Sequence, residues 1–151
     1  MTKTPTLVMT SILLLALAAP LCAAKTVEHY QSNPDLKLPF PDAVRVGDML
    51  YLSGQIGNLP GTLQLAEGGI AGETRQTMEN IKASLERHGS SLGEVVKCTV
   101  FLADIAEWGA MNEVYRSYFP VDPPARSALG ASGLALGARV EIECIAALRA
   151  N

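Results

Sequence analysis

The sequence has no excess of positive charge. Its 151 residues include 12 Lys and Arg against 15 Asp and Glu, and aromatic residues make up 5% of the chain. Proteins that bind nucleic acids present a basic stripe or patch to the phosphate backbone. No such stripe occurs in this sequence, so nucleic acid is not an expected partner.

Metal ligands are also scarce. The chain has two histidines and three cysteines, and none of them is grouped at the spacing of a metal site. We therefore expect neither a metal nor an organic cofactor.

A hydrophobic run long enough to cross a membrane is missing as well. Residues 7–21 are almost continuously apolar, but these about 15 residues fall short of the ~20 that span a bilayer, and no stop-transfer pattern follows. One positive charge, Lys3, precedes the run, and small residues end it at Ala24. Residues 1–24 are therefore interpreted as a secretory signal peptide that is cleaved after Ala24.

A lipoprotein processing site at Cys22 is the alternative interpretation, and the bulky Leu21 in front of this cysteine argues against it. We expect residues 25–151 to form the single domain of an exported protein, periplasmic or secreted, without a stable membrane anchor. This length is sufficient to bury an ordinary hydrophobic core.

Two cysteines remain in this domain. Cys98 and Cys144 each lie in the middle of an expected strand, on its apolar face. The favoured interpretation is a pair of small buried hydrophobic side chains. A disulfide is chemically possible in an exported protein, but the sequence gives no distance between the two residues.

Hydrophobic periodicity predicts the element order β-β-α-β-α-β-β. The expected elements are strands at 43–46 and 49–53, a helix at 73–88, a strand at 95–102, a helix that begins at Asp104, a strand that contains Arg126, and a strand at 140–148. Residues 25–38 are interpreted as an arm or loop, and residues 58–72 as a loop with room for one short strand. The expected fold class is α/β (α+β), with a single mixed sheet and two helices on one face.

Each helix has an apolar stripe that predicts its buried side. In the first helix the stripe consists of Met78, Ile81 and Leu85, and His88 lies in the last turn, where a cation favours the helix dipole. The second helix begins at Asp104 with Glu107 at capping-box spacing. Its buried stripe is expected to contain Trp108, Met111, Tyr115 and either Tyr118 or Phe119.

The strand at 95–102 is apolar on both faces. Val96, Cys98, Val100 and Leu102 alternate on one face, and only Lys97 interrupts the apolar character of the other. Such a strand needs cover on both sides, whereas two helices cover only one. A symmetric copy of the chain is the expected second cover, so the sequence predicts an oligomer.

Arg126 and Glu141 are the candidate catalytic residues. On the last strand Glu141 and Glu143 lie on the face opposite Val140 and Ile142, and a short return is expected to join this strand to the one that contains Arg126. The arginine could hold a substrate carboxylate through two parallel hydrogen bonds, and the glutamate could handle the proton of a water molecule. The alternative is a surface Arg–Glu ion pair on a hairpin, which contributes about 0–1 kcal/mol.

Four segments carry a resemblance to a known family. They are LPFPDAVRVGDMLYLSGQIG at 38–57, QTMENIKASLERHGSSLGEVVKCTVFLADI at 76–105, MNEVYRSYF at 111–119, and PPARSALG with ARVEIECIA towards the end of the chain. The chain resembles the RidA (YjgF-type) family of reactive intermediate deaminases over essentially the whole expected domain. The resemblance implies a chorismate-mutase-like fold, a homotrimer with three clefts between subunits, and hydrolysis of 2-imino or enamine acids, such as 2-iminobutanoate and 2-iminopropanoate, to 2-oxo acids and ammonia.

The resemblance also assigns roles to individual residues. Arg126 matches the arginine that holds the substrate carboxylate, and Glu141 matches the residue that positions or activates water. The remaining substrate-binding positions are Ser53, Gly54, Asn112, Ala128 and Phe40. Two of these depart from the family pattern: Ala128 replaces a frequent cysteine, and Phe40 replaces a tyrosine, which removes a hydroxyl from the cleft.

Three other functions are compatible with the same pattern. A non-catalytic protein could bind 2-oxo acids or related metabolites in the same clefts between subunits. An endoribonuclease role is attributed to part of the wider family, but the acidic net charge argues against it. A purely structural assembly module would leave Arg126 and Glu141 as an unneeded charge pair at an interface.

Overall fold

The computed structural model describes residues 26–31 and 38–148. The expected signal peptide at 1–24 lies outside these residues. The chain forms the strands and helices β1 (Val27–Tyr30), β2 (Ala43–Val46), β3 (Met49–Leu52), β4 (Gln55–Ile56), α1 (Gly69–Arg87), β5 (Val95–Leu102), α2 (Trp108–Tyr115), β6 (Ala125–Gly130) and β7 (Val140–Ala147). No helix in the described ranges is both long and apolar enough to cross a membrane.

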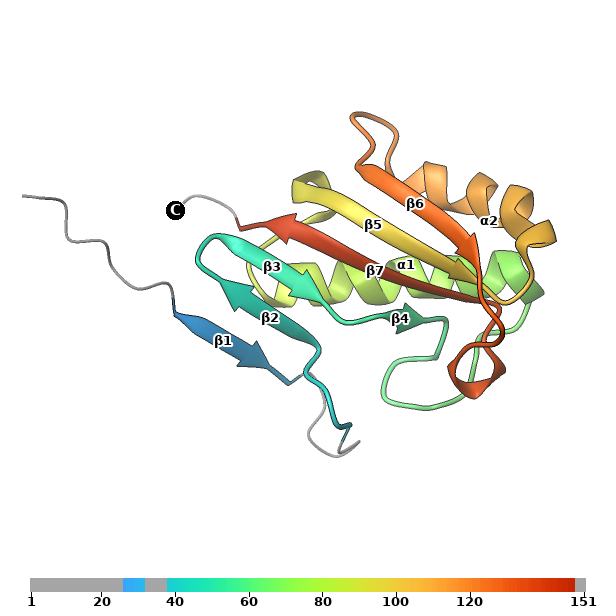
Figure 1. Cartoon of the computed structure of the whole chain (residues 1–151), viewed down its shortest axis with the longest axis horizontal. Helices are drawn as coiled ribbons and strands as arrows, with labels where there is room; N and C mark the ends of the chain where they lie inside the picture. Colours follow the sequence, from blue (N-terminus) through green and yellow to red (C-terminus); the bar gives the residue numbers. More distant parts are fainter. Residues whose placement is uncertain (1–25, 32–37, 149–151) are drawn as a thin grey trace, which may run out of the picture.

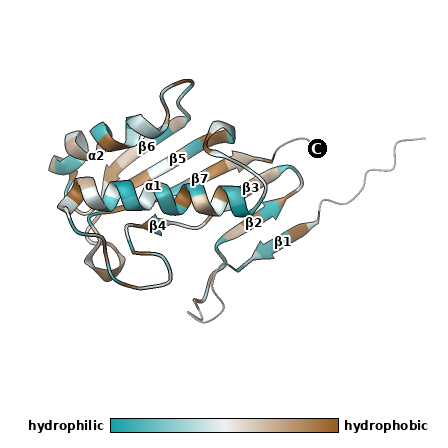
Figure 2. Ribbon diagram, turned by 180° about the vertical axis from the view of Figure 1, so that it is seen from behind, coloured by the Kyte–Doolittle hydropathy of each residue, from teal (hydrophilic) through white to brown (hydrophobic). Residues whose placement is uncertain are grey.

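The strands form one mixed sheet. Its order is β1-β2-β3-β7-β5-β6, and β4 pairs with β7 beyond the end of β3. β5 and β6 run parallel, and the other neighbouring strands run antiparallel. Both helices lie on the same side of this sheet, so the predicted architecture is confirmed (Figures 1 and 2).

The hydrophobic core lies between the helices and the sheet. Met78, Ile81 and Leu85 of α1 are fully buried in one cluster with Val100 of β5 and Ile142 of β7. Polar and apolar residues alternate along α1, as Figure 2 shows. Each fully buried side chain of this size stabilises the fold by about 1.5–3 kcal/mol. The predicted stripe of the first helix is therefore confirmed.

The N-terminal edge of the sheet was not predicted. Val27–Tyr30 pairs with β2 in antiparallel register, so the expectation of an arm or loop at 25–38 is wrong for these four residues. Most side chains of β1 are exposed. The strand therefore lacks the apolar alternation by which a half-buried strand is recognised in a sequence.

Helix α1 begins four residues earlier than predicted, at Gly69 instead of residue 73. Gly68 and Gly69 have φ values of 99° and 61°, which glycine adopts without steric cost. Glycine is a poor helix former, so the glycines at the start of α1 did not indicate a helix, and its first turn was missed.

The start of β5 also differs from the prediction. The register between β5 and β7 shifts at Val95 and Lys97, which is a β-bulge. Because of this bulge Val95 is buried and Val96 is 46% exposed. The expectation that Val96 joins the core face is therefore wrong, whereas Cys98, Val100 and Leu102 lie there as predicted.

A single 3-10 turn leads into the second helix. A 3-10 turn at Ile105–Glu107 precedes α2, and the Asp104 carboxylate accepts a hydrogen bond of 2.9 Å from the Ala106 N–H. Asp104 thus caps the start as predicted, but the Glu107 carboxylate accepts hydrogen bonds from the Arg139 side chain. Met111 is buried, while Trp108 is 42% exposed and does not belong to the buried stripe.

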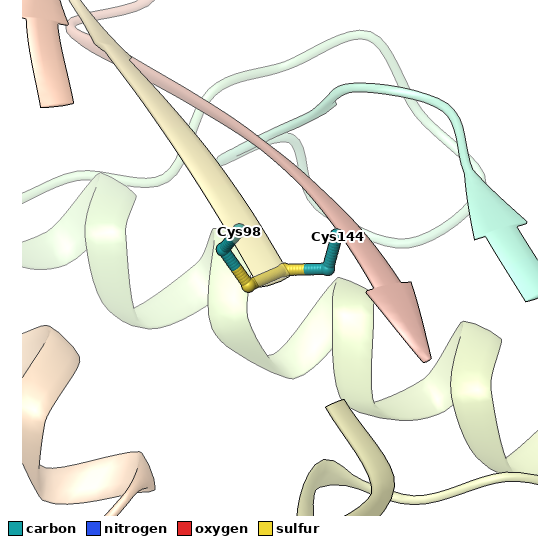
Figure 3. Close-up of a disulfide and its surroundings, with 2 residues drawn as sticks. All are labelled: Cys98 and Cys144. Atoms are coloured by element: carbon teal, nitrogen blue, oxygen red, sulfur yellow. A yellow bond between two sulfur atoms is a disulfide. The ribbon is translucent and has the colours of Figure 1, made fainter. Parts of the chain in front are cut away.

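Cys98 and Cys144 form a disulfide, which corrects the interpretation as two unlinked hydrophobic side chains (Figure 3). They face each other directly across β5 and β7, with sulfur atoms 2.02 Å apart and both residues 1% exposed. The sequence predicted their burial. The link depends on the register of two strands that are 46 residues apart at this point, which periodicity does not reveal.

Replacing both cysteines, as in Cys98→Ala/Cys144→Ala, is expected to lower the free energy of unfolding by about 2–4 kcal/mol, because the unfolded chain regains the freedom of a long closed loop. Chemical denaturation of the oxidised protein and of the double variant measures this difference. Reductant should lower the midpoint of the native protein and leave that of the double variant unchanged. Two titratable thiols in the unfolded, unreduced protein would contradict the disulfide.

Candidate functional site

The seven site residues predicted from the sequence fall into two separate places. Phe40, Ser53, Gly54 and Glu141 line a single cleft of about 490 Å³, which we call the Glu141 cleft. Arg126 and Ala128 lie on β6, and Asn112 lies on α2, which packs on the helix side of the sheet. The structure thus brings together four of the predicted residues and keeps the arginine apart from them.

Strand pairing explains this separation. Cys98 of β5 is paired with Arg126 on one side and with Cys144 on the other, so Arg126 occupies the face that the helices cover. Phe101, three residues further along β5, is paired with Glu141. Side chains alternate along a strand, so Glu141 projects from the open face.

The expected short return between the two candidate residues is therefore wrong. β5 lies between β6 and β7, so these strands do not form a hairpin. This arrangement also excludes the alternative of a surface Arg126–Glu141 ion pair within one chain. The connection through Ala131–Arg139 crosses the end of the sheet, a path that sequence spacing alone does not indicate.

Glu141 lies directly against the backbone of Gly54. A Cβ atom at position 54 would overlap the Glu141 carboxylate, so only glycine leaves room for it. Burial raises the pKa of Glu141 above its ordinary value, and the negative charge of Glu143 raises it further. A carboxyl group of this kind keeps its proton to higher pH than an ordinary glutamate, which suits it to accept and return a proton during a reaction.

A carboxylate network fixes one wall of the Glu141 cleft. Asp42 lines the cleft and accepts a hydrogen bond of 2.7 Å from Ser84 Oγ at the end of α1. Its Oδ2 also lies 3.1 Å from His88 Nε2 and 3.2 Å from Arg87 Nη1, and the His88 ring stacks on Tyr30 with centroids 4.6 Å apart. These contacts tie the strand before the cleft to α1, and they give His88 specific partners that helix position did not predict.

Arg126 is held by two aromatic rings. Its Cζ lies 4.6 Å from the ring centroid of Tyr115 and 5.7 Å from that of Trp108, distances typical of cation–π contacts. Among the described residues no carboxylate forms an ion pair with Arg126. The guanidinium is thus oriented by its neighbours while its hydrogen-bond donors remain available for an anion.

Tyr115 carries a buried hydroxyl beside this arginine. The hydroxyl has no hydrogen-bond partner within the described part of the chain. Burial raises the pKa of Tyr115 to about 12, against the opposing effect of Arg126. The sequence assigned Tyr115 and Trp108 to a buried stripe and gave no indication that they flank the arginine.

Metal coordination finds no support in the described residues, because no three His, Cys, Asp or Glu side chains are grouped as ligands there. The Glu141 cleft itself is lined by two carboxylates, Asp42 and Glu141, together with backbone groups and an apolar wall.

The fold and the Glu141 cleft define a class of protein. The family model described as Endoribonuclease L-PSP matches residues 30–148, and the chain belongs to this family. The resemblance to RidA (YjgF-type) proteins that the sequence motifs indicated is confirmed by the relatives that follow.

Named relatives cover most of the chain. Protein DfrA of Myxococcus xanthus is 39% identical over 125 residues, which are 82% of this chain and 95% of that protein. The 2-iminobutanoate/2-iminopropanoate deaminase of Mus musculus is 43% identical over 108 residues, 72% of this chain and 80% of that protein. The crystal structure of RidA from the Antarctic bacterium Psychrobacter matches with a TM-score of 0.71 and 35% identity, over 83% of this chain and 98% of that one.

Replacing Glu143 by glutamine is expected to lower the pKa of Glu141, because the second cause of its elevation is removed while burial remains. Carboxyl carbon chemical shifts followed against pH measure this change. Glu113→Gln, on the exposed side of α2, is the matched control and should leave the titration unchanged. An unaltered Glu141 titration in Glu143→Gln would contradict the assigned cause.

The raised pKa of Glu141 also determines how this residue makes the stability of the fold depend on pH. The folded-state pKa of Glu141 lies above its ordinary value of 4.5, so ionisation is more costly in the folded chain than in the unfolded chain. This contribution to stability therefore falls as pH rises from 4.5 through the raised pKa. Glu141→Gln should remove that part of the pH dependence.

Proposed function

We propose that the protein hydrolyses 2-imino and enamine acids to 2-oxo acids and ammonia, in clefts that two copies of the chain complete together. The proposal is carried by the presence in one chain of two groups: a glutamate with a raised pKa in an open cleft, and, on the other face, an arginine that has no ionic partner among the described residues. The name of the mouse relative, an imine deaminase, supports the same reaction.

Arg126 orients the substrate in this proposal. Its planar guanidinium binds the substrate carboxylate through two parallel hydrogen bonds, and the Trp108 and Tyr115 rings restrict its motion. A fixed carboxylate places the imine carbon at a defined position, which converts a chance encounter with water into an attack within the complex.

Glu141 moves the protons. It takes one proton from water as the oxygen bonds to C2 of the protonated imine, and the C=N double bond becomes a C–N single bond whose electron pair stays on nitrogen. It then returns that proton to the nitrogen, ammonia leaves with the C–N electron pair, and the protonated C2 carbonyl gives its proton back to Glu141, which releases it to solvent and leaves the 2-oxo acid. Water is the only co-reactant, so atoms and electrons balance without a cofactor.

Two copies are needed because Glu141 and Arg126 lie on opposite faces of one sheet. The open face also bears half-exposed apolar side chains, among them Tyr51 and Leu129. In a closed ring the Glu141 cleft of one copy meets the Arg126 side of the next, and each copy uses both surfaces once. The homotrimer implied by the family resemblance is the ring that we propose.

Arg126→Ala and Glu141→Gln are each expected to lower kcat/KM for 2-iminobutanoate by roughly 100-fold or more, since each removes an interaction that the reaction depends on. Arg126→Lys should fail nearly as badly because the two-pronged hydrogen bonding is lost. Release of 2-oxobutanoate from enzymatically generated imine measures these rates. Glu143→Gln is the matched control and should cost far less.

Mixing the two inactive variants tests whether the site is shared. If Arg126→Ala and Glu141→Gln chains are unfolded, mixed in equal amounts and refolded, about one cleft in four receives both intact residues, so about a quarter of the activity should return. Each variant refolded alone is the control. No recovery in a mixture of normal oligomeric mass would contradict the shared site. Wild-type rates in Arg126→Ala would overturn the role assigned to Arg126, and saturable binding of 2-oxobutanoate without turnover would favour a non-catalytic binding protein.

We also propose that the protein acts outside the cytoplasm. The leader-like pattern at 1–24 supports this, and so does the buried Cys98–Cys144 disulfide, because structural disulfides persist chiefly in oxidising compartments.

Expression of the full chain should place the protein in the exported fraction, with Lys25 as its first residue by N-terminal sequencing. A variant that lacks residues 2–24 should remain in the cytoplasm, where acid trapping followed by thiol labelling in denaturant should detect reduced Cys98 and Cys144. An uncleaved chain in the cytoplasmic fraction would contradict export.

A further inference from the structure

Exposed apolar side chains gather around the Glu141 cleft. Large hydrophobic residues with more than a third of their surface in solvent include Leu38, Phe40, Leu63 and Leu136, with exposures of 44%, 48%, 57% and 54%. All four line this one cleft. Exposed apolar surface concentrated in a concave site is typical of a ligand-binding wall.

Leu136 occupies an unusual backbone position. It has φ 58° and ψ 14°, in the single turn Ala135–Gly137 that precedes β7. Residues other than glycine, asparagine and aspartate rarely adopt this left-handed conformation, and such strain concentrates at functional sites. The strained backbone presents a large apolar side chain to the cleft that contains Glu141.

The charge of the cleft restricts what it can bind. The described lining residues include two carboxylates, Asp42 and Glu141, and no lysine, arginine or histidine. A second negative charge on a substrate would therefore meet like charges and no cation. The lining does not suit the imines of acidic amino acids.

We propose that this cleft accepts the side chain of a 2-imino acid that is large and apolar, either branched aliphatic or aromatic, and that Leu63 and Leu136 determine this preference. The inference rests on the proposed deaminase function and names its substrate class. A cleft of about 490 Å³ falls in the range of sites that enclose ligands well above the size of a three-carbon acid. A longer apolar side chain displaces water from both leucines, which favours binding roughly fourfold for each buried methylene.

The experiment compares imines of increasing side-chain size, formed in situ by an amino-acid oxidase from alanine, 2-aminobutanoate, leucine, phenylalanine and glutamate. We expect kcat/KM to rise at least tenfold from the alanine imine to the leucine imine, and to be lowest for the glutamate imine. The rates are taken from release of the corresponding 2-oxo acids above the uncatalysed hydrolysis.

Two substitutions test the residues. Asparagine is close to leucine in size and tolerates a left-handed backbone, so Leu136→Asn and Leu63→Asn remove the apolar surface without a clash. Each should lower kcat/KM for the leucine and phenylalanine imines at least fivefold and leave that for the alanine imine within twofold. Val121→Asn, at a residue 75% exposed and outside the cleft, is the matched control and should change neither. Thermal unfolding and hydrodynamic mass show whether each variant is folded and assembled.

The outcomes separate this inference from the function on which it rests. A flat or falling profile with side-chain size, with the alanine imine still hydrolysed, overturns the preference and leaves the deaminase proposal intact. Equal losses on all substrates in folded Leu136→Asn and Leu63→Asn also overturn it, because a specificity role predicts selective loss. No turnover of any imine by the wild-type protein overturns both.

Discussion

The pairing of β5 with β7 on one side and β6 on the other determines where every functional side chain lies. Side chains alternate along each strand, so register places Arg126 with the helices and Glu141 on the open face. A shift of one residue would exchange these faces. The Cys98–Cys144 disulfide joins β5 to β7 within this register, so the position of Glu141 relative to β5 is fixed covalently, whereas the β6 strand of Arg126 is held to β5 by hydrogen bonds.

The Glu141 cleft is built from parts with different physical roles. Gly54 gives the carboxylate room, and burial together with Glu143 raises its pKa. Asp42 ties the neighbouring wall to the end of α1 through buried polar contacts. The polar side is therefore tied to a strand and a helix, whereas the apolar side is formed by leucines in connecting segments. Binding residues on loops that a regular scaffold positions are common in binding sites.

The sequence predicted the features that depend on local periodicity. Met78 and Ile81 were placed in the core because apolar residues recur at helical spacing, and the two helices and the mixed sheet followed from the same patterns. The predictions were wrong at residues whose environment depends on how strands distant in the sequence pair with each other. Val96 is exposed by a bulge, and the disulfide of Cys98 depends on a register that only the folded sheet defines.

The candidate site was predictable as a set of residues but not as an arrangement. Family motifs located Glu141, Gly54 and Arg126, yet sequence spacing suggested that the two charges share a hairpin, and β5 separates them. Leu136 escaped notice because nothing in a loop sequence predicts a leucine with positive φ. The sequence shows which residue types are present, whereas the strand order determines which of them lie close together in space.

The position of Trp108 makes the fluorescence of the protein useful for following binding. It is the single tryptophan of the chain, and its ring lies 5.7 Å from the Arg126 guanidinium. Indole emission depends on nearby charge and on exposure to water. The protein therefore carries an intrinsic optical reporter beside its arginine, through which occupancy of that half of the site can be observed without a label.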